Sequence, residues 1–365
     1  MKLAADLTEE LQGCQFGDSR LTKRLNKLAQ ELAHKPNISI PAALKSKGDI
    51  EGCYRFFNND KVTAERILQP HIESTYQRIS QVDFALLVQD TTEIDLTRPE
   101  QQVEGAGPMD CESRRGAFYH PMVAFDPDGV ALGIVGAKSW TRQQIERASE
   151  TDKCKKRRAK PIEQKESYRW VEGVKTAELA AAACNETTCV CVGDSESDIY
   201  DVFVAAKQSE YSNLHLLLRA GQHRNTAERQ DWAEHVRSTT PIGEQTVHIR
   251  GRQAKFANDQ RTSRSRSRQA RVAELLIRKA TINVCRPING ANQHLPKLVS
   301  VNLVLCEEVD PPAGEDAISW MLVTTLPIDT DEQVQQIISA YCVRWQIEVF
   351  FRTLKSVSYT HLRAH

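Results

Sequence analysis

The stretch FALLVQD at residues 84–90 decides how we interpret the middle of this 365-residue chain. It is a short apolar run of the length expected for a buried β-strand, and it ends at Asp90. A second run, TCVCVGD at residues 188–194, has the same form and ends at Asp194. Ligand sites in open α/β sheets gather at the ends of strands, so both aspartates are candidate site residues.

Further strand and helix patterns alternate around these two runs. The turn signal DPDG at residues 126–129 separates two strand candidates. The expected strands cover 118–125, 130–138 and 213–219, and the expected helices cover 162–183 and 197–207. This order predicts an α/β fold with a mixed sheet covered by helices.

Residues 225–327 interrupt that rhythm. They contain β-type runs near 244–250, 298–305 and 320–326, so we interpret this region as a mostly β insertion. The Ser/Arg alternation at residues 261–268 is typical of a loop. After the insertion, a long helix is expected over residues 331–355.

Residues 1–75 are predicted to be a helical region ahead of the sheet. The sequence GDS at 17–19 provides a helix cap, and Pro36 ends the helix that follows. Pro41 suits the first turn of a second helix, and residues 51–57 are a third candidate. The first helix separates leucines from cations: Leu21, Leu25, Leu28 and Leu32 oppose Arg20, Lys23, Arg24 and Lys27. Such a region is similar to a small DNA-binding module; the alternative is a solvated amphipathic helix without a ligand.

The composition is that of an ordinary globular protein, with 40% hydrophobic and 26% charged residues. No run approaches the roughly 18 apolar residues of a membrane helix. The N-terminus, MKLAADLTEEL, lacks the apolar segment of a secretory signal, so we expect a cytoplasmic protein without membrane contact. The ten cysteines include no CxxC pair, which favours reduced thiols over zinc ligands or disulfides.

The net charge is zero, with 48 basic and 48 acidic residues, but the cations are unevenly spread. The segment KCKKRRAK at 153–160 holds six cations and no acid. Residues 251–280 hold nine cations against two acids. Local basic patches can bind phosphate backbones even on a neutral protein, and the alternative for each run is a solvated loop.

The expected helix 331–355 carries a polar stripe. A residue advances by about 100° around a helix, so with Tyr341 at zero, Arg344 lies at about −60° and Glu348 at about −20°. Lys355 falls in the same stripe at about −40°. The apolar residues on another face are expected to pack on the sheet: Val343, Ile347, Phe350 and Leu354. The stripe offers a carboxylate flanked by cations, an arrangement suited to gripping phosphate, and a solvated charged face is the alternative.

Asp90, Asp194 and Glu348 together suit a pair of Mg²⁺ ions, which prefer oxygen ligands. Two such ions can activate a water or 3′-OH and stabilise the leaving oxygen when a phosphodiester is displaced. The three carboxylates are therefore predicted to converge on a metal-dependent phosphodiester site.

The spacing Y-x2-R-x3-E-x6-K over residues 341–355 resembles the signature of bacterial cut-and-paste DDE transposases in insertion sequence family four. Other blocks are similar to this family, in the same order, over residues from about 10 to 356. They are GDSRLTKRL (17–25), EGCYRF (51–56), DTT (90–92), KES (165–167), DSESDI (194–199) and PPAGE (311–315), followed by Trp320.

The resemblance implies a ribonuclease H-like catalytic core over 76–356, with its β insertion at about 225–327, preceded by the helical DNA-binding domain. It implies Asp90, Asp194 and Glu348 as catalytic metal ligands for Mg²⁺ or Mn²⁺. The reaction would be nicking at the transposon end, hairpin formation, hairpin opening and strand transfer into target DNA. Several residues would contact DNA: Tyr341, Arg344 and Lys355 at the terminal phosphates, Trp320 by stacking near a flipped base, and Arg20, Lys23, Arg24 and Arg219 elsewhere. From the residues alone, Trp320 is more typical of the core.

The family continues into a helical C-terminal region that pairs two protomers as a homodimer. Here SYTHLRAH (358–365) resembles translated adaptor sequence, so we interpret 357–365 as a non-native tail and the dimerisation region as missing. The leading interpretation is a DNA transposase acting on transposon-end and target DNA in the bacterial cytoplasm, at the nucleoid. Two alternatives are a catalytically incompetent DNA-binding fragment or transposition inhibitor, and a general ribonuclease H-like nuclease.

Overall fold

The computed structural model describes residues 9–35, 38–44, 46–98, 100, 102–111, 113–143, 160–251, 268–288 and 292–362, the last six as backbone only. Two compact units share the chain. The first contains Met1–Arg147, Thr176–Cys189 and Val343–His365, and the second contains Ala148–Lys175 and Val190–Cys342. Each is described by itself. No helix within the described ranges is both long and apolar enough to cross a membrane.

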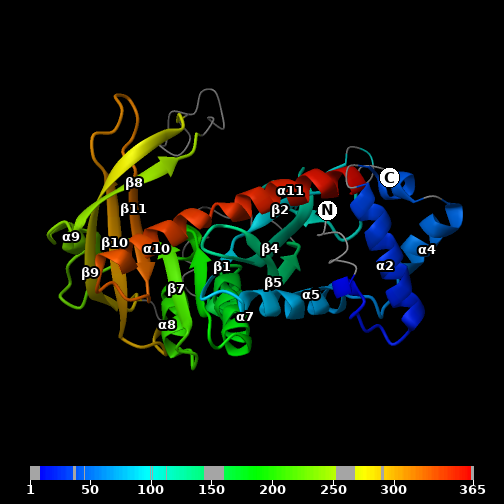
Figure 1. The fold of residues 1–365 in the computed structure, drawn as a ribbon, viewed down its shortest axis with the longest axis horizontal. Helices are drawn as coiled ribbons and strands as arrows, with labels where there is room; N and C mark the ends of the chain where they lie inside the picture. Colours follow the sequence, from blue (N-terminus) through cyan, green and yellow to red (C-terminus); the bar gives the residue numbers. More distant parts are fainter. Residues whose placement is uncertain are drawn as a thin grey trace. The chain divides into compact units, whose positions relative to one another are not determined.

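The first unit begins with helices, as predicted (Figure 1). They are α2 (Ser19–His34), α3 (Ile40–Ala43), α4 (Lys47–Phe57) and α5 (Ala64–Ile79). Asp18 caps α2, because its carboxylate accepts a hydrogen bond from the Arg20 backbone N–H at 2.9 Å. The Arg20 guanidinium also bonds this carboxylate and lowers the pKa of Asp18 to about 2. Pro41 lies in the first turn of α3 as expected, whereas Pro36 lies outside the described residues.

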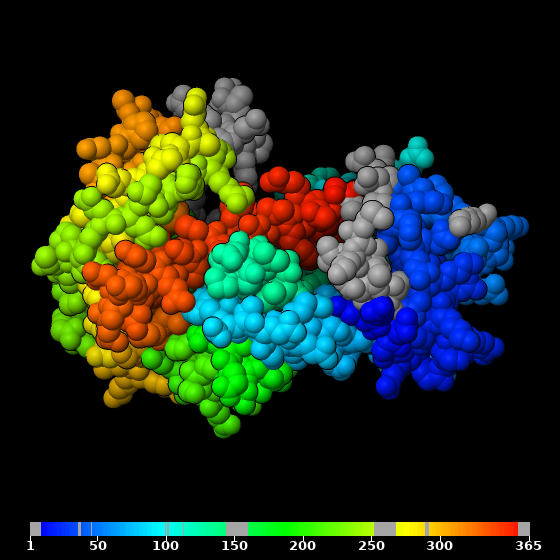
Figure 2. Space-filling view, viewed as in Figure 1, coloured from blue at the N-terminus to red at the C-terminus, as the bar shows by residue number. Residues whose placement is uncertain are grey.

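A small apolar cluster holds these helices together. Leu25 and Leu28 are buried on the inner face of α2, which confirms the leucine spacing. Phe16 meets Phe56 of α4 edge to face, with ring centroids 5.8 Å apart, and buried Cys53 completes the centre. The outer surfaces of α2 and α4 are left to solvent (blue in Figure 2).

The strands of the first unit surround β4 (Arg115–Phe125). It pairs antiparallel with β1 (Phe84–Gln89), with Val88 opposite Val123, and with β5 (Ala131–Trp140). Two short strands escaped prediction because they lack an apolar run, β2 (Thr92–Asp95) and β3 (Gly107–Pro108), and both pair with β4. The expected turn at 126–129 joins β4 to β5, with Gly129 at a φ of 83° that favours glycine.

Helix α5 lies against β5 (Figure 1), and polar side chains of the helix bond to the strand. Arg78 donates to the Leu132 carbonyl, and the His71 Nε2 atom accepts from the Ile134 backbone N–H at 2.9 Å. The proton of this imidazole is therefore on Nδ1, which donates to Glu10 at 2.6 Å. The edge of the sheet is thereby tied to the helical region.

The second unit contains strands in the order β6-β7-β11-β10-β9-β8. Expected strands correspond to β6 (Thr188–Gly193), β7 (Leu214–Arg219), β8 (Gly243–Ile249), β10 (Leu298–Glu308) and β11 (Ser319–Thr324). Before β6 lie η1 (Ile162–Gln164) and α7 (Tyr168–Ala183), and the residues of α7 from Thr176 onward belong to the first unit. After β6 lie η2 (Ser195–Ser197) and α8 (Tyr200–Gln208). The predicted helix 162–183 is thus observed as η1 and α7, and the predicted helix 197–207 is observed at 200–208. The helix α9 (Trp232–Arg237) was not expected.

The strand β9 (Arg271–Cys285) is the main correction to the predicted insertion. It has 15 residues and begins within the cation-rich stretch 251–280, for which no strand is predicted. Ala273, Leu275 and Ile277 are buried in alternation, while Glu274 is exposed. Of the cations of that stretch that precede β9, only Arg268 is described, and it donates to the Arg250 carbonyl at 3.1 Å. The other five lie outside the described residues, as do residues 153–159 and 261–267 of the expected loop.

The long helix expected over 331–355 is wrong in one respect, because it is interrupted at Arg344 and Trp345. Helix α10 (Asp331–Val343) precedes the break and α11 (Gln346–Leu362) follows it. A continuous rotation of 100° per residue therefore does not relate Tyr341 to Glu348, although Glu348 and Lys355 still share one stripe of α11. Helix α11 also includes the backbone of residues 357–362, which we had interpreted as the start of a non-native tail.

The cysteines within the described ranges are free thiols. Burial raises the pKa of Cys189 and of Cys306 to about 12, so both remain protonated and unreactive at neutral pH.

Candidate functional site

Asp90 lies at the end of β1 in the first unit. The strand that leads to it is buried from Ala85 to Gln89, so the carboxylate emerges from the core at a fixed point. Its Oδ1 atom accepts from the Thr91 backbone N–H at 2.7 Å, and its Oδ2 atom accepts from Arg344 at 3.2 Å. Both partners of this ion pair are mostly shielded, each with a side chain 15% exposed. The position of the Asp90 carboxylate is thus defined from two directions.

The buried imidazole of His120 holds the two residues on either side of Asp90. Gln89 and Thr91 flank the aspartate and, because side chains alternate along an extended chain, both point to the opposite face. His120 of β4 contacts both, with Nε2 3.1 Å from the Gln89 Oε1 atom and Nδ1 2.9 Å from the Thr91 hydroxyl. The amide oxygen can only accept, so Nε2 carries the proton and Nδ1 accepts from Thr91. The backbone on each side of Asp90 is consequently fastened to β4.

Glu348 occupies the first turn of α11, four residues after Arg344, in the same unit as Asp90. Ile347 and Phe351 are buried and anchor this helix, while Glu348 and Lys355 are half-buried. The start of α11 contacts the 126–129 turn, because a Cβ added at Gly129 would lie 3.2 Å from the Gln346 side chain. The predicted apolar face is confirmed at Ile347 only, since Val343, Phe350 and Leu354 are half-buried.

Asp194 belongs to the second unit. It follows the buried strand β6 and caps η2, because its Oδ1 atom accepts from the Glu196 backbone N–H at 2.8 Å. The side chain is half-buried. Capping alone can account for an aspartate at the end of this strand, without a bound ligand. The cap uses the Oδ1 atom of Asp194.

Trp320 and Tyr341 are neighbours in the second unit, with ring centroids 5.9 Å apart in an edge-to-face arrangement. Tyr341 is 8% exposed, so it is a buried support for Trp320 rather than the open lining residue that the helix arithmetic indicated. Arg219 at the end of β7 is half-buried and donates to the Ser319 carbonyl at 3.2 Å. Arg219 is therefore tied to the residue that precedes Trp320.

The cationic face of α2 is less positive than its sequence indicates. Arg24 and Lys27 both reach the same acid, Asp49 of α4, and form ion pairs with it. Arg20 pairs with its own helix cap. Lys23 is exposed between them. Sequence periodicity found these cations but not their acidic partner, which lies on another helix.

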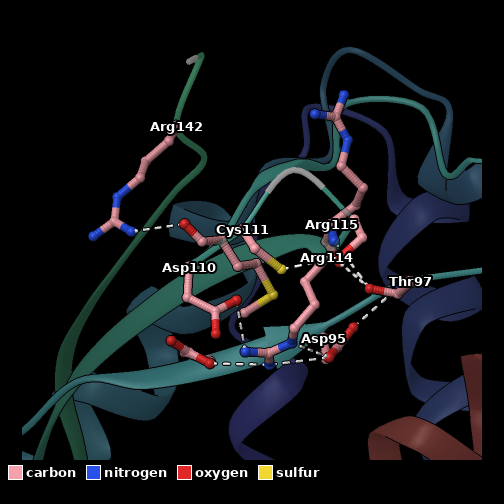
Figure 3. A network of polar contacts seen from close by, with 10 residues as sticks. Asp95, Thr97, Asp110, Cys111, Arg114, Arg115 and Arg142 are labelled. Carbon is pink, nitrogen blue, oxygen red and sulfur yellow. Dashed lines mark hydrogen bonds and ion pairs between the residues drawn. The ribbon is translucent and has the colours of Figure 1, made fainter. Parts of the chain in front are cut away.

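A separate cluster of three acids, on β2 and just after β3, is bound by Arg114 (Figure 3). Arg114 forms ion pairs with Asp95 at 3.0 Å, Glu93 at 3.2 Å and Asp110 at 2.9 Å. Its hydrogen bond to Asp95 and those to the other carboxylates raise the pKa of Arg114. These acids hold β2 and β3 to β4, which makes them poor candidates for a metal centre.

Divalent ions would need carboxylate oxygens, and the donor types of Asp90, Asp194 and Glu348 fit that need. Within the part of the chain that the structure describes, no set of three or more His, Cys, Asp or Glu side chains forms a metal-binding group. What the first unit does bring together is Asp90 with the segment Arg344–Glu348, and Asp194 is placed separately in the second unit.

Comparison with known proteins identifies two families. The family described as Transposase DNA-binding matches residues 4–62, and the family described as Transposase DDE domain matches residues 172–365, just over half of the chain. Among solved structures, the chain is similar to a cryo-EM structure of the piggyBac transposase synaptic complex with hairpin DNA. The two are 11% identical with a TM-score of 0.35, and the match covers 97% of this chain and 59% of that one.

The imidazole under Asp90 gives a direct prediction. Replacing His120 by Ala leaves the buried Gln89 amide and Thr91 hydroxyl without this partner, so the free energy of unfolding should fall by about 1–3 kcal/mol. Urea denaturation measures the change. The control is His223→Ala, since His223 is 99% exposed and its variant should match the wild type. Equal stability of both variants would contradict a supporting role for His120.

Proposed function

The chain belongs to the transposase DDE domain family, and we propose that it is a DNA transposase whose catalytic carboxylates are Asp90, Asp194 and Glu348. The observation that carries this proposal is the ion pair between Asp90 and Arg344, which joins residues 254 positions apart. It supports a site in which the strand-end aspartate faces the start of α11, where Glu348 lies. The match of the DDE family includes Asp194 and Glu348 but begins after Asp90.

The three carboxylates would hold two Mg²⁺ or Mn²⁺ ions, which lower the pKa of an attacking water or 3′-OH and stabilise the leaving oxygen. Arg344 already neutralises Asp90 in the protein alone. When DNA binds, its guanidinium is suited to a bidentate contact with a phosphate beside the same carboxylate. Lys355, on the stripe of Glu348, would bind the next phosphate along the strand.

We further propose the chemistry of insertion sequence family four: nicking, hairpin formation, hairpin opening and strand transfer. Removing a base from the stack costs a few kcal/mol, and stacking on an aromatic ring returns about 1–3 kcal/mol. Trp320 is suited to that stacking because Tyr341 supports its ring. Tyr341 would then act through Trp320, and Arg219 would steady the same strand end.

The DNA-binding domain is proposed to be residues 1–75 and the catalytic domain residues 76–356. Helix α2, within the matched DNA-binding family, would bind phosphates of the transposon end chiefly through Lys23, and through Arg20 and Arg24 where a phosphate replaces their acidic partners Asp18 and Asp49. Target DNA would enter at the carboxylates. We propose that the protein acts in the bacterial cytoplasm at the nucleoid, where both DNA substrates lie. It would act there as a homodimer.

Phosphate contacts predict a difference between two lysines of α2. Lys23→Ala should weaken binding to a short DNA duplex and reduce the slope of log K against log salt by about 1, because one released counterion is lost. Lys27→Ala is the matched control: its ammonium already pairs with Asp49, so its effect on the slope should be smaller. Fluorescence anisotropy at several salt concentrations gives both slopes. A larger effect of Lys27 would rule out this assignment.

The metal site predicts a separation of binding from cleavage. Glu348→Gln removes a proposed metal ligand, so it should abolish cleavage of a duplex that carries the terminal repeat. It removes no cation, and phosphate contacts supply the affinity for DNA, so the affinity of the variant for this duplex should stay within about twofold of the wild type. Glu332→Gln, at an exposed position on α10, is the control and should cleave normally. A gel shift and a cleavage assay on one substrate decide the matter. Wild-type cleavage by the Glu348 variant would exclude it as a catalytic residue.

A further inference from the structure

The second unit contains a buried ion pair four residues beyond Asp194. The side chain of Asp198 is fully buried and that of Arg224 is 8% exposed. The guanidinium donates to the Asp198 Oδ1 atom from Nε at 2.9 Å and from a terminal nitrogen at 2.5 Å. The same terminal nitrogen also donates to the Asp198 backbone carbonyl at 2.7 Å. Arg224 therefore grips both the side chain and the main chain of one residue.

The other carboxylate oxygen of Asp198 is also engaged. Its Oδ2 atom accepts from the backbone N–H groups of Gly221 at 2.7 Å and Gln222 at 2.8 Å. With both oxygens occupied in the interior, Asp198 is not available as a metal ligand. The two aspartates of the DSESD segment thus have different environments: Asp194 is half-buried and Asp198 is enclosed.

The guanidinium is itself held by aromatic side chains. The Arg224 Cζ atom lies 5.1 Å from the ring centroid of Phe203 and 5.6 Å from that of Trp232. Both rings are buried, on α8 and α9 respectively. Arginine at such a site has cation–π contacts in addition to its hydrogen bonds, so lysine is not an equivalent replacement.

These contacts join two loops that follow neighbouring strands. Residues 194–198 come directly after β6 and residues 220–224 directly after β7, and these strands are adjacent. The loops are in close contact, because a Cβ added at Gly221 would lie 2.7 Å from the Ser195 carbonyl oxygen. Within the first loop, the Ser197 hydroxyl donates to the Asp194 carbonyl at 2.5 Å. The backbone of Asp194 is therefore fixed relative to Asp198.

A buried ion pair is a costly way to stabilise a fold, since apolar residues of similar volume often do as well or better. It is more useful where one loop conformation must be selected. We propose that Asp198 and Arg224 are a positioning pair that holds the β6 loop in the conformation in which Asp194 binds a divalent ion. The inference rests on the proposed function of Asp194, and it assigns a role to two residues whose side chains are enclosed within the second unit.

The test is Mn²⁺ binding by the purified full chain, followed by the electron paramagnetic resonance signal of free Mn²⁺. Arg224→Lys keeps the positive charge but loses the planar guanidinium that makes several hydrogen bonds at once. Asp198→Asn leaves one acceptor oxygen, which can serve either Arg224 or the two backbone N–H groups but not both, because the amide nitrogen only donates. Groups that orient metal ligands typically contribute 10–100-fold to affinity, so both variants should bind Mn²⁺ at least about tenfold more weakly. Hydrogen exchange at residues 195–198 and 221–222 should become faster, with the rest of the second unit unchanged.

Arg237→Lys is the matched control, because Arg237 also pairs with an acid, Glu307, but is half exposed and distant in sequence from Asp194. It should bind Mn²⁺ like the wild type. Asp194→Asn separates the two levels of the proposal: if it leaves Mn²⁺ affinity unchanged, the proposed function of Asp194 fails. If Asp194→Asn weakens binding but the Asp198 and Arg224 variants do not, the positioning pair is refuted. Loss of the whole fold in both variants would refute it too, since the pair would then support the unit and not one loop.

Discussion

The ion pair between Asp90 and Arg344 is the contact that brings the candidate residues of the first unit together. It links the end of the first buried strand to a residue near the start of the last helix, across most of the chain. A carboxylate at 15% exposure needs a compensating charge, and Arg344 provides it. Because Arg344 lies at the interruption between α10 and α11, the same contact fixes where α11 begins and so where Glu348 is presented.

Both strand-end aspartates are supported by buried polar groups that a metal would not contact. Beneath Asp90, one imidazole fastens the residues on either side of it to β4. Behind Asp194, the pair of Asp198 and Arg224 fastens its loop to the loop after β7. The chemistry differs but the physical requirement is the same, since a metal ligand held loosely loses affinity and geometry.

The apolar strands and their terminal aspartates were predictable, because burial imposes a local pattern on the sequence. The capping role of Asp18 and the turn at Gly129 were predictable for the same reason. The interruption at Arg344 was not, since nothing in the helical periodicity of 331–355 marks it. Nor were the partners His120, Asp49 and Arg224, because contacts between residues far apart in sequence leave no periodic signal. The alternation of β9 is present in its sequence, but the strand runs through a cation-rich stretch whose charges are more typical of a loop.

The proposal that Asp90, Asp194 and Glu348 share a divalent-ion site can be tested by cleavage of the protein itself. Fe²⁺ bound in place of Mg²⁺ generates hydroxyl radicals with ascorbate and peroxide, and these cut the peptide backbone next to the ion. Mass spectrometry of the fragments then identifies the segments that surround it. We expect cuts near residues 90, 194 and 348 together, all lost in the Asp90→Asn variant. Cuts at only one of these segments, or cuts that persist without the Asp90 carboxylate, would contradict it.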